Sequence, residues 1–245
     1  MSDLRVALTG DDAAVRRRVD EAGWTVVPSD APDADALVTV GERALVDAAL
    51  SGPAAPLLPV VPADAGAAEA AGGRHAVRAA EVGAALDAVA SGDAAAVDHP
   101  VLAVSDSGER VARALFDVSL ITSEPAGISE YSVRADDRRL DGFRADGVVV
   151  ATPLGSAGYA RATGGPLLEP GTGLAVVPVS PFATRWDARV VDGRVRLRVE
   201  RDDTEVSLVA DDRVVRPVSP AATLDVTPAG SVELLDVGRR FPPRR

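Results

Sequence analysis

The sequence predicts an α/β N-terminal domain with a Rossmann-like open sheet, followed by a C-terminal all-β sandwich. Over the first ninety-odd residues, short apolar runs alternate with helical stretches, which indicates parallel strands in an α/β layer. After Asp98 the apolar runs become β-type and turn signals recur every several residues, as in an antiparallel sandwich. Hydrophobic residues make up 47% of the chain, which is enough for a real core.

The α/β domain is expected over residues 1–98. Asp11 or Asp12 should cap its first helix, because a carboxylate accepts hydrogen bonds from the free amides at a helix start. Residues 62–73 are rich in Ala, Gly and Asp and predict a surface loop. The predicted strands are 4–8, 24–27, 35–40 and 57–61, and the predicted helices are 11–22, 42–50 and 80–90.

The sandwich is expected over residues 99–245, with its C-terminal tail packing back on the first domain. Asp-Gly pairs that begin at Asp141, Asp146 and Asp192 predict turns between strands. The predicted strands are 101–104, 116–121, 131–133, 148–151, 174–179, 189–191, 195–199, 206–210, 223–226 and 231–235.

Composition excludes several classes of function. The chain has no cysteine, so disulfides and thiolate chemistry are excluded, and its two histidines, His75 and His99, lack the spacing of a zinc site. No tightly bound, protein-ligated metal is expected. A net charge of −11 with no basic stripe argues against nucleic-acid binding.

The kinds of charged residue are also informative. Every basic residue is Arg, and Lys, Asn and Gln are absent, which is typical of a protein from a salt-loving (halophilic) organism of high GC content. No apolar run approaches the roughly 18 residues of a membrane span. The first ten residues indicate a strand rather than a signal peptide, so a cytoplasmic location is expected.

One stretch is far more specific than the rest. A buried strand at 148–151 leads into Thr152-Pro153-Leu154-Gly155-Ser156-Ala157-Gly158-Tyr159, and Gly164-Gly165-Pro166 follows five residues later. Glycine-rich backbone beside one tyrosine, directly after a strand, favours close approach to a flat or phosphorylated ligand. With Asp146-Gly147 before the strand, the pattern resembles the DG…TPtGStaYs…GGP signature of the NAD kinase family.

The resemblance implies that a dinucleotide lies between the two domains and that ATP, with Mg²⁺, donates the phosphoryl group. Tyr159 matches the tyrosine that packs on the dinucleotide, Asp146 a carboxylate near the nicotinamide end, and Asp117 the acidic residue that holds ribose hydroxyls. The remaining substrate-binding positions that it implies are Gly41, Leu154, Ala157, Gly158, Ala162, Gly164 and Gly165. A homo-oligomer, dimer or tetramer, is also expected by resemblance.

The sequence departs from the family at several places. Ala157 and Gly158 replace the Thr-Ala of the family's GSTAY, and Ala162 stands where a serine is usual, so hydroxyl groups are lost from the pocket. Phe116 stands where the family has an adenine-reading Asn, and a phenyl ring cannot form hydrogen bonds with a base edge. The family's GGDGT motif is reduced to Gly41 and Glu42, so Glu42 is the candidate base for the ribose 2′-hydroxyl. Val40 and Arg43 are expected to bring side chains into the space that backbone amides leave for phosphate.

Three functions therefore stay open from the sequence. The first is an NAD kinase that forms NADP from NAD, with Glu42 as the base. The second is a non-catalytic relative, a pseudokinase candidate, that binds a nucleotide or a protein partner and regulates, in which case Glu42 and Arg43 are only the first turn of an exposed helix. The third is a kinase of another diol substrate, since the adenine-reading position has changed.

Overall fold

The computed structural model describes residues 4–63, 75–124, 127–136, 138–182, 187–202 and 204–237. The chain divides into two compact units: Met1–Asp98 with Val232–Arg245, and His99–Ser231. Most of the loop predicted at 62–73, and the tail from 238 onward, lie outside the described residues. Among the described residues, no helix has both the length and the apolar character needed to cross a membrane.

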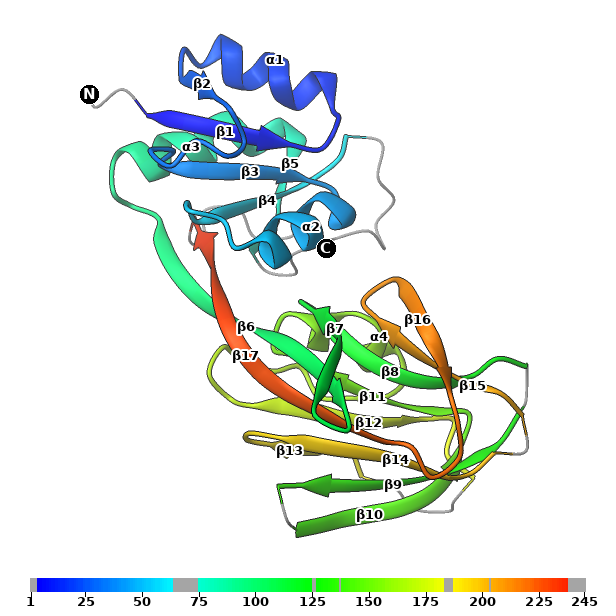
Figure 1. The fold of residues 1–245 in the computed structure, drawn as a ribbon. Helices are drawn as coiled ribbons and strands as arrows, with labels where there is room; N and C mark the ends of the chain where they lie inside the picture. The colour runs from blue at the N-terminus through cyan, green and yellow to red at the C-terminus, as the bar shows by residue number, and fades with distance from the viewer. Residues whose placement is uncertain are drawn as a thin grey trace. The chain divides into compact units, whose positions relative to one another are not determined.

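The first unit is a parallel sheet with helices on both faces (Figure 1). Its strands pair in the order β2-β1-β3-β4-β5, and the end of β17 also pairs in parallel with β4, with Leu234 opposite Leu57. Asp12 caps α1, as predicted, by accepting hydrogen bonds from the amides of Ala14 and Val15. The elements are β1 Arg5–Thr9, α1 Ala13–Glu21, β2 Thr25–Val27, β3 Ala36–Val40, α2 Glu42–Ser51, β4 Leu57–Val61, β5 Val77–Arg78, the 3-10 turn η2 Ala79–Glu81 and α3 Val82–Ala90.

The core of the first unit follows from strand alternation. Alternate residues of β3, Ala36, Val38 and Val40, face one side of the sheet and pack with apolar residues of α1 and α3. Helix α2 buries a separate apolar stripe, which includes Leu45 and Val46. In Figure 1, α1 and α2 lie on opposite sides of the sheet.

The second unit is a β-sandwich, so the predicted fold class is confirmed in both parts. One sheet runs β10-β9-β14-β17, with β6 pairing with β17 and β7 with β6, and the other runs β13-β12-β11-β8-β15-β16. Its elements are β6 Ala95–Asp106, β7 Glu109–Ala114, β8 Asp117–Thr122, β9 Ser129–Ala135, β10 Arg138–Ala145, β11 Gly147–Ala151, the 3-10 turn η3 Gly155–Ala157, α4 Tyr159–Ala162, β12 Leu174–Val179, β13 Arg189–Val191, β14 Val195–Arg201, β15 Val206–Ala210, β16 Arg213–Val218 and β17 Thr223–Asp236.

The inner faces of the two sheets form the main core of the second unit. Tyr131 on β9, Leu197 on β14 and Leu120 on β8 are fully or almost fully buried there. A second, smaller core lies on the outer face of β11 and β12, where Val149 and Val177 pack with Ala160 of α4. Helix α4 therefore covers the outer face of this sheet.

One turn prediction is wrong. Asp141 and Gly142 lie inside β10, where they pair with Val133 and Ser132 of β9, and an irregularity in the ladder between Arg139 and Asp141 absorbs the mismatch. The Asp-Gly pair therefore marks a local distortion of a strand and does not end it. The strands β5, β7, β10 and β16 are not among those that the sequence predicts.

Candidate functional site

In the first unit, Gly10 and Gly41 follow two neighbouring parallel strands, β1 and β3, at the same edge of the sheet. An added Cβ on Gly10 would lie 2.4 Å from the carbonyl oxygen of Val40, so the two turns are in contact. The strand order reverses between β1 and β3, and in open α/β sheets ligands bind at the carboxyl edge beside such a reversal. Gly41 and Glu42 thus occupy the place where this kind of sheet binds ligands.

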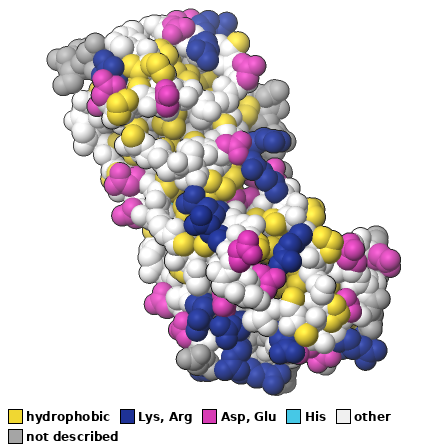
Figure 2. Space-filling model, in the orientation of Figure 1, with side chains coloured by type: hydrophobic (Ala, Val, Ile, Leu, Met, Phe, Trp, Pro, Cys, Tyr) yellow, Lys and Arg dark blue, Asp and Glu magenta, His cyan; other side chains and the backbone are white. Residues whose placement is uncertain are grey.

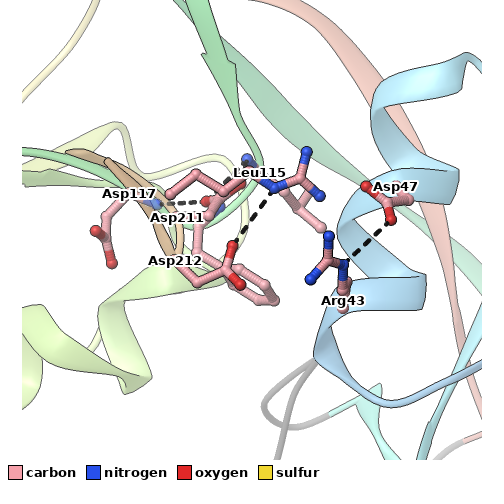
Figure 3. Close-up of polar contacts among 8 residues, drawn as sticks. Arg43, Asp47, Leu115, Asp117, Asp211 and Asp212 are labelled. Carbon is pink, nitrogen blue, oxygen red and sulfur yellow. Dashed lines mark hydrogen bonds and ion pairs between the residues drawn. The ribbon is translucent and has the colours of Figure 1, made fainter. Parts of the chain in front are cut away.

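The local geometry around Glu42 is that of a helix start. Gly41 is the N-cap of α2 with φ +85°, a conformation that favours glycine, and its amide donates to the carbonyl of Val60. Glu42 is the first residue of α2 and is exposed. Arg43 is also exposed and forms a long ion pair of 4.0 Å with Asp47 one turn later (Figure 3).

The expectation for Val40 is wrong. Its side chain is only 7% exposed and packs in the core of the first unit, on the same face as Val38. Because residues alternate along a strand, the last residue of β3 points into the core and not into the loop that follows. Of the two side chains expected to fill the space for phosphate, Arg43 alone is exposed there.

In the second unit, Asp117 and Asp146 lie at opposite ends of the β8–β11 pair. Asp117 is the first residue of β8, lies opposite Ala151 of β11, and is 8% exposed. Asp146 lies in the bend between β10 and β11, where its carbonyl accepts hydrogen bonds from the amide and hydroxyl of Thr122. Both positions are therefore fixed by the sheet itself.

The segment between β11 and α4 leads to Tyr159. Tyr159 is the first residue of α4 and is 44% exposed, an unusual degree of exposure for a large aromatic ring. Burial, and then the charges of Asp117 and Asp146, raise the pKa of the Tyr159 phenol. The phenol stays protonated at neutral pH, so Tyr159 offers a hydrogen-bond donor and an exposed ring face.

The other predicted positions divide into two groups. Ala157, Gly158, Ala162 and Gly164 are exposed with Tyr159 along the surface of η3 and α4. Leu154 and Gly165 are buried. An added Cβ on Gly165 would lie 2.7 Å from the carbonyl oxygen of Ala160 and 2.8 Å from Cγ2 of Val177, so glycine is needed to pack the chain against α4 and β12.

Sequence reasoning missed the residues that hold Asp117 in place. The Asp211 carboxylate accepts hydrogen bonds from three successive backbone amides, those of Leu115 (3.0 and 3.2 Å), Phe116 (2.7 Å) and Asp117 (3.2 Å), as Figure 3 shows for the labelled members. In return the Asp211 amide donates to the Asp117 carbonyl at 2.9 Å. Burial raises the pKa of Asp211, and these amides partly offset the increase.

The opposite side of the same turn is held by the TPLGS motif. The Thr152 hydroxyl is fully buried and lies 2.9 and 3.0 Å from the carbonyl oxygens of Leu115 and Phe116. The Thr152 amide donates to the Phe116 carbonyl at 2.9 Å. An added Cβ on Gly155 would lie 2.0 Å from that carbonyl oxygen, so only glycine fits. Thr152 and Gly155 of the motif therefore fix the backbone of the residues that precede Asp117.

The comparisons with known proteins agree with this geometry. Residues 115–231 match the family model of the ATP-NAD kinase C-terminal domain. The NAD kinase of Methanopyrus kandleri is 35% identical over 129 residues, which are 52% of this chain and 47% of that protein. The NAD kinase of Methanosarcina acetivorans is 44% identical over 98 residues, 40% of this chain and 36% of that protein. The match spans about half or less of these curated relatives.

Solved structures show the same fold at low identity. The crystal structure of an NAD kinase from Archaeoglobus fulgidus in complex with ATP has a TM-score of 0.69 and 21% identity, and covers 97% of this chain and 94% of that one. Yeast NADH kinase complexed with NADH has a TM-score of 0.75 and 15% identity, with 95% and 83% covered. The chain has the fold of the solved NAD kinases, and residues 115–231 are similar to the ATP-NAD kinase C-terminal domain.

Proposed function

We propose that this protein is an ATP-dependent NAD kinase, which phosphorylates the 2′-hydroxyl of the adenosine ribose of NAD to give NADP. The observation that carries the proposal is that Asp117, at the start of β8, and Tyr159, at the start of α4, both lie in the segment that matches the family model, with Asp117 held by the sheet and Tyr159 exposed. A buried carboxylate suits two vicinal ribose hydroxyls, and a half-exposed tyrosine suits stacking on a heteroaromatic ring.

The proposal gives each residue a chemical role. Glu42 accepts the proton of the ribose 2′-hydroxyl as the hydroxyl oxygen forms a bond to the γ-phosphorus of ATP. At the same time the bond between that phosphorus and the β,γ-bridging oxygen breaks, and ADP leaves. Asp117 orients the ribose, and Tyr159 holds the ring of the dinucleotide. The exposed guanidinium of Arg43 is suited to bind phosphate.

ATP as donor is supported by the Archaeoglobus fulgidus NAD kinase, whose structure contains it. Within the described part of the chain, no three His, Cys, Asp or Glu side chains are grouped so that they could hold a metal ion. In this proposal Mg²⁺ arrives with ATP as part of the substrate.

Replacing Glu42 with Gln tests the catalytic part of the proposal. We expect the rate of NADP formation from ATP and NAD to fall by about 10²–10⁴-fold, because glutamine cannot accept a proton, while NAD affinity changes little. Asp47→Asn is the matched control, since it removes a carboxylate one turn further along α2. Equal activity in Glu42→Gln and wild type would remove Glu42 from the mechanism.

A second candidate function is nucleotide binding without turnover, in a regulatory role. It is favoured by the exposure of Glu42 at an ordinary helix start, with Gly41 the only glycine of the family motif retained. Calorimetry separates the two functions: NAD binding with no NADP formation by the wild-type chain supports the regulator. NADP formation that Glu42→Gln abolishes supports the kinase. A kinase of another diol predicts phosphoryl transfer to a different acceptor and weak NAD binding.

Substitution of Tyr159 tests the stacking role. Tyr159→Ala should weaken NAD binding by roughly five- to tenfold, since aromatic stacking contributes about 1 kcal/mol beyond the contact area, and Tyr159→Phe should retain most of the affinity. Calorimetric titration with NAD measures both. Val214→Ala removes an exposed apolar side chain elsewhere in the same unit and serves as the control. A Tyr159→Ala variant with unchanged affinity would contradict the role.

A further inference from the structure

One side of the β-sandwich is bounded by two edge strands, one from each sheet. Among the described strands, β10 pairs with β9 alone and β13 pairs with β12 alone. A cavity of about 470 Å³ is lined by residues from both edges, and we call it the edge cavity. Its lining residues are Arg138, Arg139 and Leu140 from β10, Ala188 directly before β13, and Arg189, Val190 and Val191 from β13.

Two arginines of the edge cavity belong to the inner faces of the two sheets. Arg189 lies opposite Val176 of β12, and Arg138 lies opposite Ala135 of β9. Residues directly opposite each other on neighbouring strands share a face of the sheet. Both Val176 and Ala135 belong to the main core of the second unit. Inner faces of a sandwich are normally apolar, so a cation on each of the two facing edges needs a physical reason.

Apolar side chains line the edge cavity beside the arginines. Val191 is buried in the main core of the second unit, and Leu140 packs against that core. Val190 is 49% exposed, which is a high value for a large apolar side chain. Small-molecule sites are concave, have volumes of about 300–1,000 Å³, and combine apolar walls with a few polar groups that fix the orientation of the ligand. The edge cavity has this size and this composition.

The charge of the lining favours an anion. The lining residues include three arginines and no acidic residue, in a chain that has 37 acidic and 26 basic residues. Within the described part of the chain, the side chains of Arg138, Arg139 and Arg189 form no hydrogen bond or ion pair. Around the strands that Figure 1 labels β9 and β10, Figure 2 shows basic side chains gathered on the visible surface. An anion in the edge cavity would therefore meet three available guanidinium groups.

We propose that the edge cavity binds a phosphate monoester with an apolar body of one or two rings. The two sheets of a sandwich pack about 10 Å apart, so one phosphate can accept hydrogen bonds from guanidinium groups of both edges. A phosphate monoester carries nearly two negative charges above pH 7, because its second pKa is about 6, and three arginines match this charge better than that of a carboxylate. The apolar body lies on Leu140, Val190 and Val191. The inference does not rest on the proposed function, because no residue assigned to NAD lines this cavity.

The inner arginines have a second explanation, which is protection of the sheet edges. Charged residues that point inward on edge strands prevent another chain from pairing there. That role accounts for one charge at each edge, but it requires neither a cavity nor apolar walls beside the charge. It predicts that Arg189→Gln aggregates more readily and that the wild-type cavity binds no ligand, so experiment separates the two explanations.

Calorimetric titration of the full chain with 1-naphthyl phosphate tests the proposal, at an ionic strength of about 0.1 M, where screening is moderate. We expect one site per chain. Inorganic phosphate has only the head and 1-naphthol only the body, so each should bind about tenfold or more weakly. 1-Naphthoate, which carries a single charge, should also bind more weakly. Arg189→Gln should weaken binding of 1-naphthyl phosphate by about tenfold or more. The matched control is Arg110→Gln, an exposed arginine on β7 of the same unit, which should not change it.

A second variant separates the apolar wall from the charges. Val190→Thr puts a hydroxyl in place of a methyl group at a half-exposed position, so the protein should still fold. It should weaken binding of 1-naphthyl phosphate and leave that of inorganic phosphate unchanged. Thermal unfolding gives an independent readout: 1-naphthyl phosphate should raise the transition temperature of wild type and of Arg110→Gln, but not that of Arg189→Gln. If Arg189→Gln does not fold, Arg138→Gln on the opposite edge replaces it, with the same expected loss of binding.

Three results would overturn the inference. Equal affinity for 1-naphthyl phosphate in wild type, Arg189→Gln and Arg138→Gln would remove the arginines from the site. Loss of binding in Tyr159→Ala with retention in Arg189→Gln would place the ligand at the surface of α4 instead. No binding by wild type, together with aggregation of Arg189→Gln, would leave edge protection as the role of the inner arginines.

Discussion

Asp211→Ala should destabilise the β-sandwich unit by about 3 kcal/mol or more. The substitution leaves the amides of Leu115, Phe116 and Asp117 without their shared acceptor, and an unsatisfied buried donor costs about 1–3 kcal/mol. The same turn holds Asp117, so NAD affinity should fall with stability. Urea unfolding of the variant and of wild type measures the loss of stability. Calorimetric titration of both proteins with NAD measures the loss of affinity.

Asp211→Asn separates the acceptor from the charge. The asparagine oxygen can still accept from Phe116 and Asp117, but its amide group faces the Leu115 N–H, where wild type has an acceptor at 3.0 Å. A smaller loss, about 1–2 kcal/mol, is therefore expected. Asp212→Asn on the adjacent, exposed position is the matched control.

The pKa shift of Asp211 adds a pH signature with a definite sign. Burial raises the pKa of this carboxyl above 3.8 in the folded state, so the folded state binds its proton more readily than the unfolded state. The contribution that proton binding by Asp211 makes to the free energy of unfolding is fully present below pH 3.8. It is lost as the pH rises through the higher pKa of the folded state. The stability difference between wild type and Asp211→Asn should thus be larger at mildly acidic pH than at pH 7, and a difference that grows toward neutral pH would contradict this assignment.

The sequence predicted the layers of this fold well because its apolar periodicity reports burial directly. β3 and β11, which are buried on both faces, read as continuous apolar runs, and Asp12 identified the start of α1. The missed β10 has the opposite character. Half of its sequence, RRLDGFRA, is exposed, and it contains an Asp-Gly pair, so local chemistry indicated a turn and only pairing with β9 makes it a strand.

The residues of the candidate site were predictable only where they stand close together in a short sequence motif. Tyr159 and its glycines stand together in the sequence, and the structure keeps them together in η3, α4 and the turn that follows. The role of Asp211 depends on hydrogen bonds to residues that precede it by 94 to 96 positions, which no local pattern reports.

Gly155→Ala should have the largest effect of any single methyl group added in this segment. Its Cβ would lie 2.0 Å from the oxygen, 2.4 Å from the carbon and 2.9 Å from the Cα of Phe116, and all three are backbone atoms. Overpacking usually costs 1–3 kcal/mol when side chains can move aside, so a loss of about 3 kcal/mol or more is expected here. The Phe116 carbonyl is also the acceptor for Thr152, and moving it would break that contact as well.

The position of Asp117 makes this a functional prediction too. Phe116 and Asp117 are adjacent, so a displaced Phe116 moves the carboxylate that we assign to the ribose, and NAD affinity should fall further than in Tyr159→Ala. Gly83→Ala is the matched control: it lies in α3 with no atom within 4 Å of the added Cβ, and alanine there should stabilise the helix by about 0.5–1 kcal/mol. Urea unfolding and calorimetry in both variants decide the matter. A Gly155→Ala protein that is as stable as wild type, with unchanged NAD affinity, would contradict the close contact between Gly155 and the Phe116 backbone. It would mean that other contacts hold Asp117.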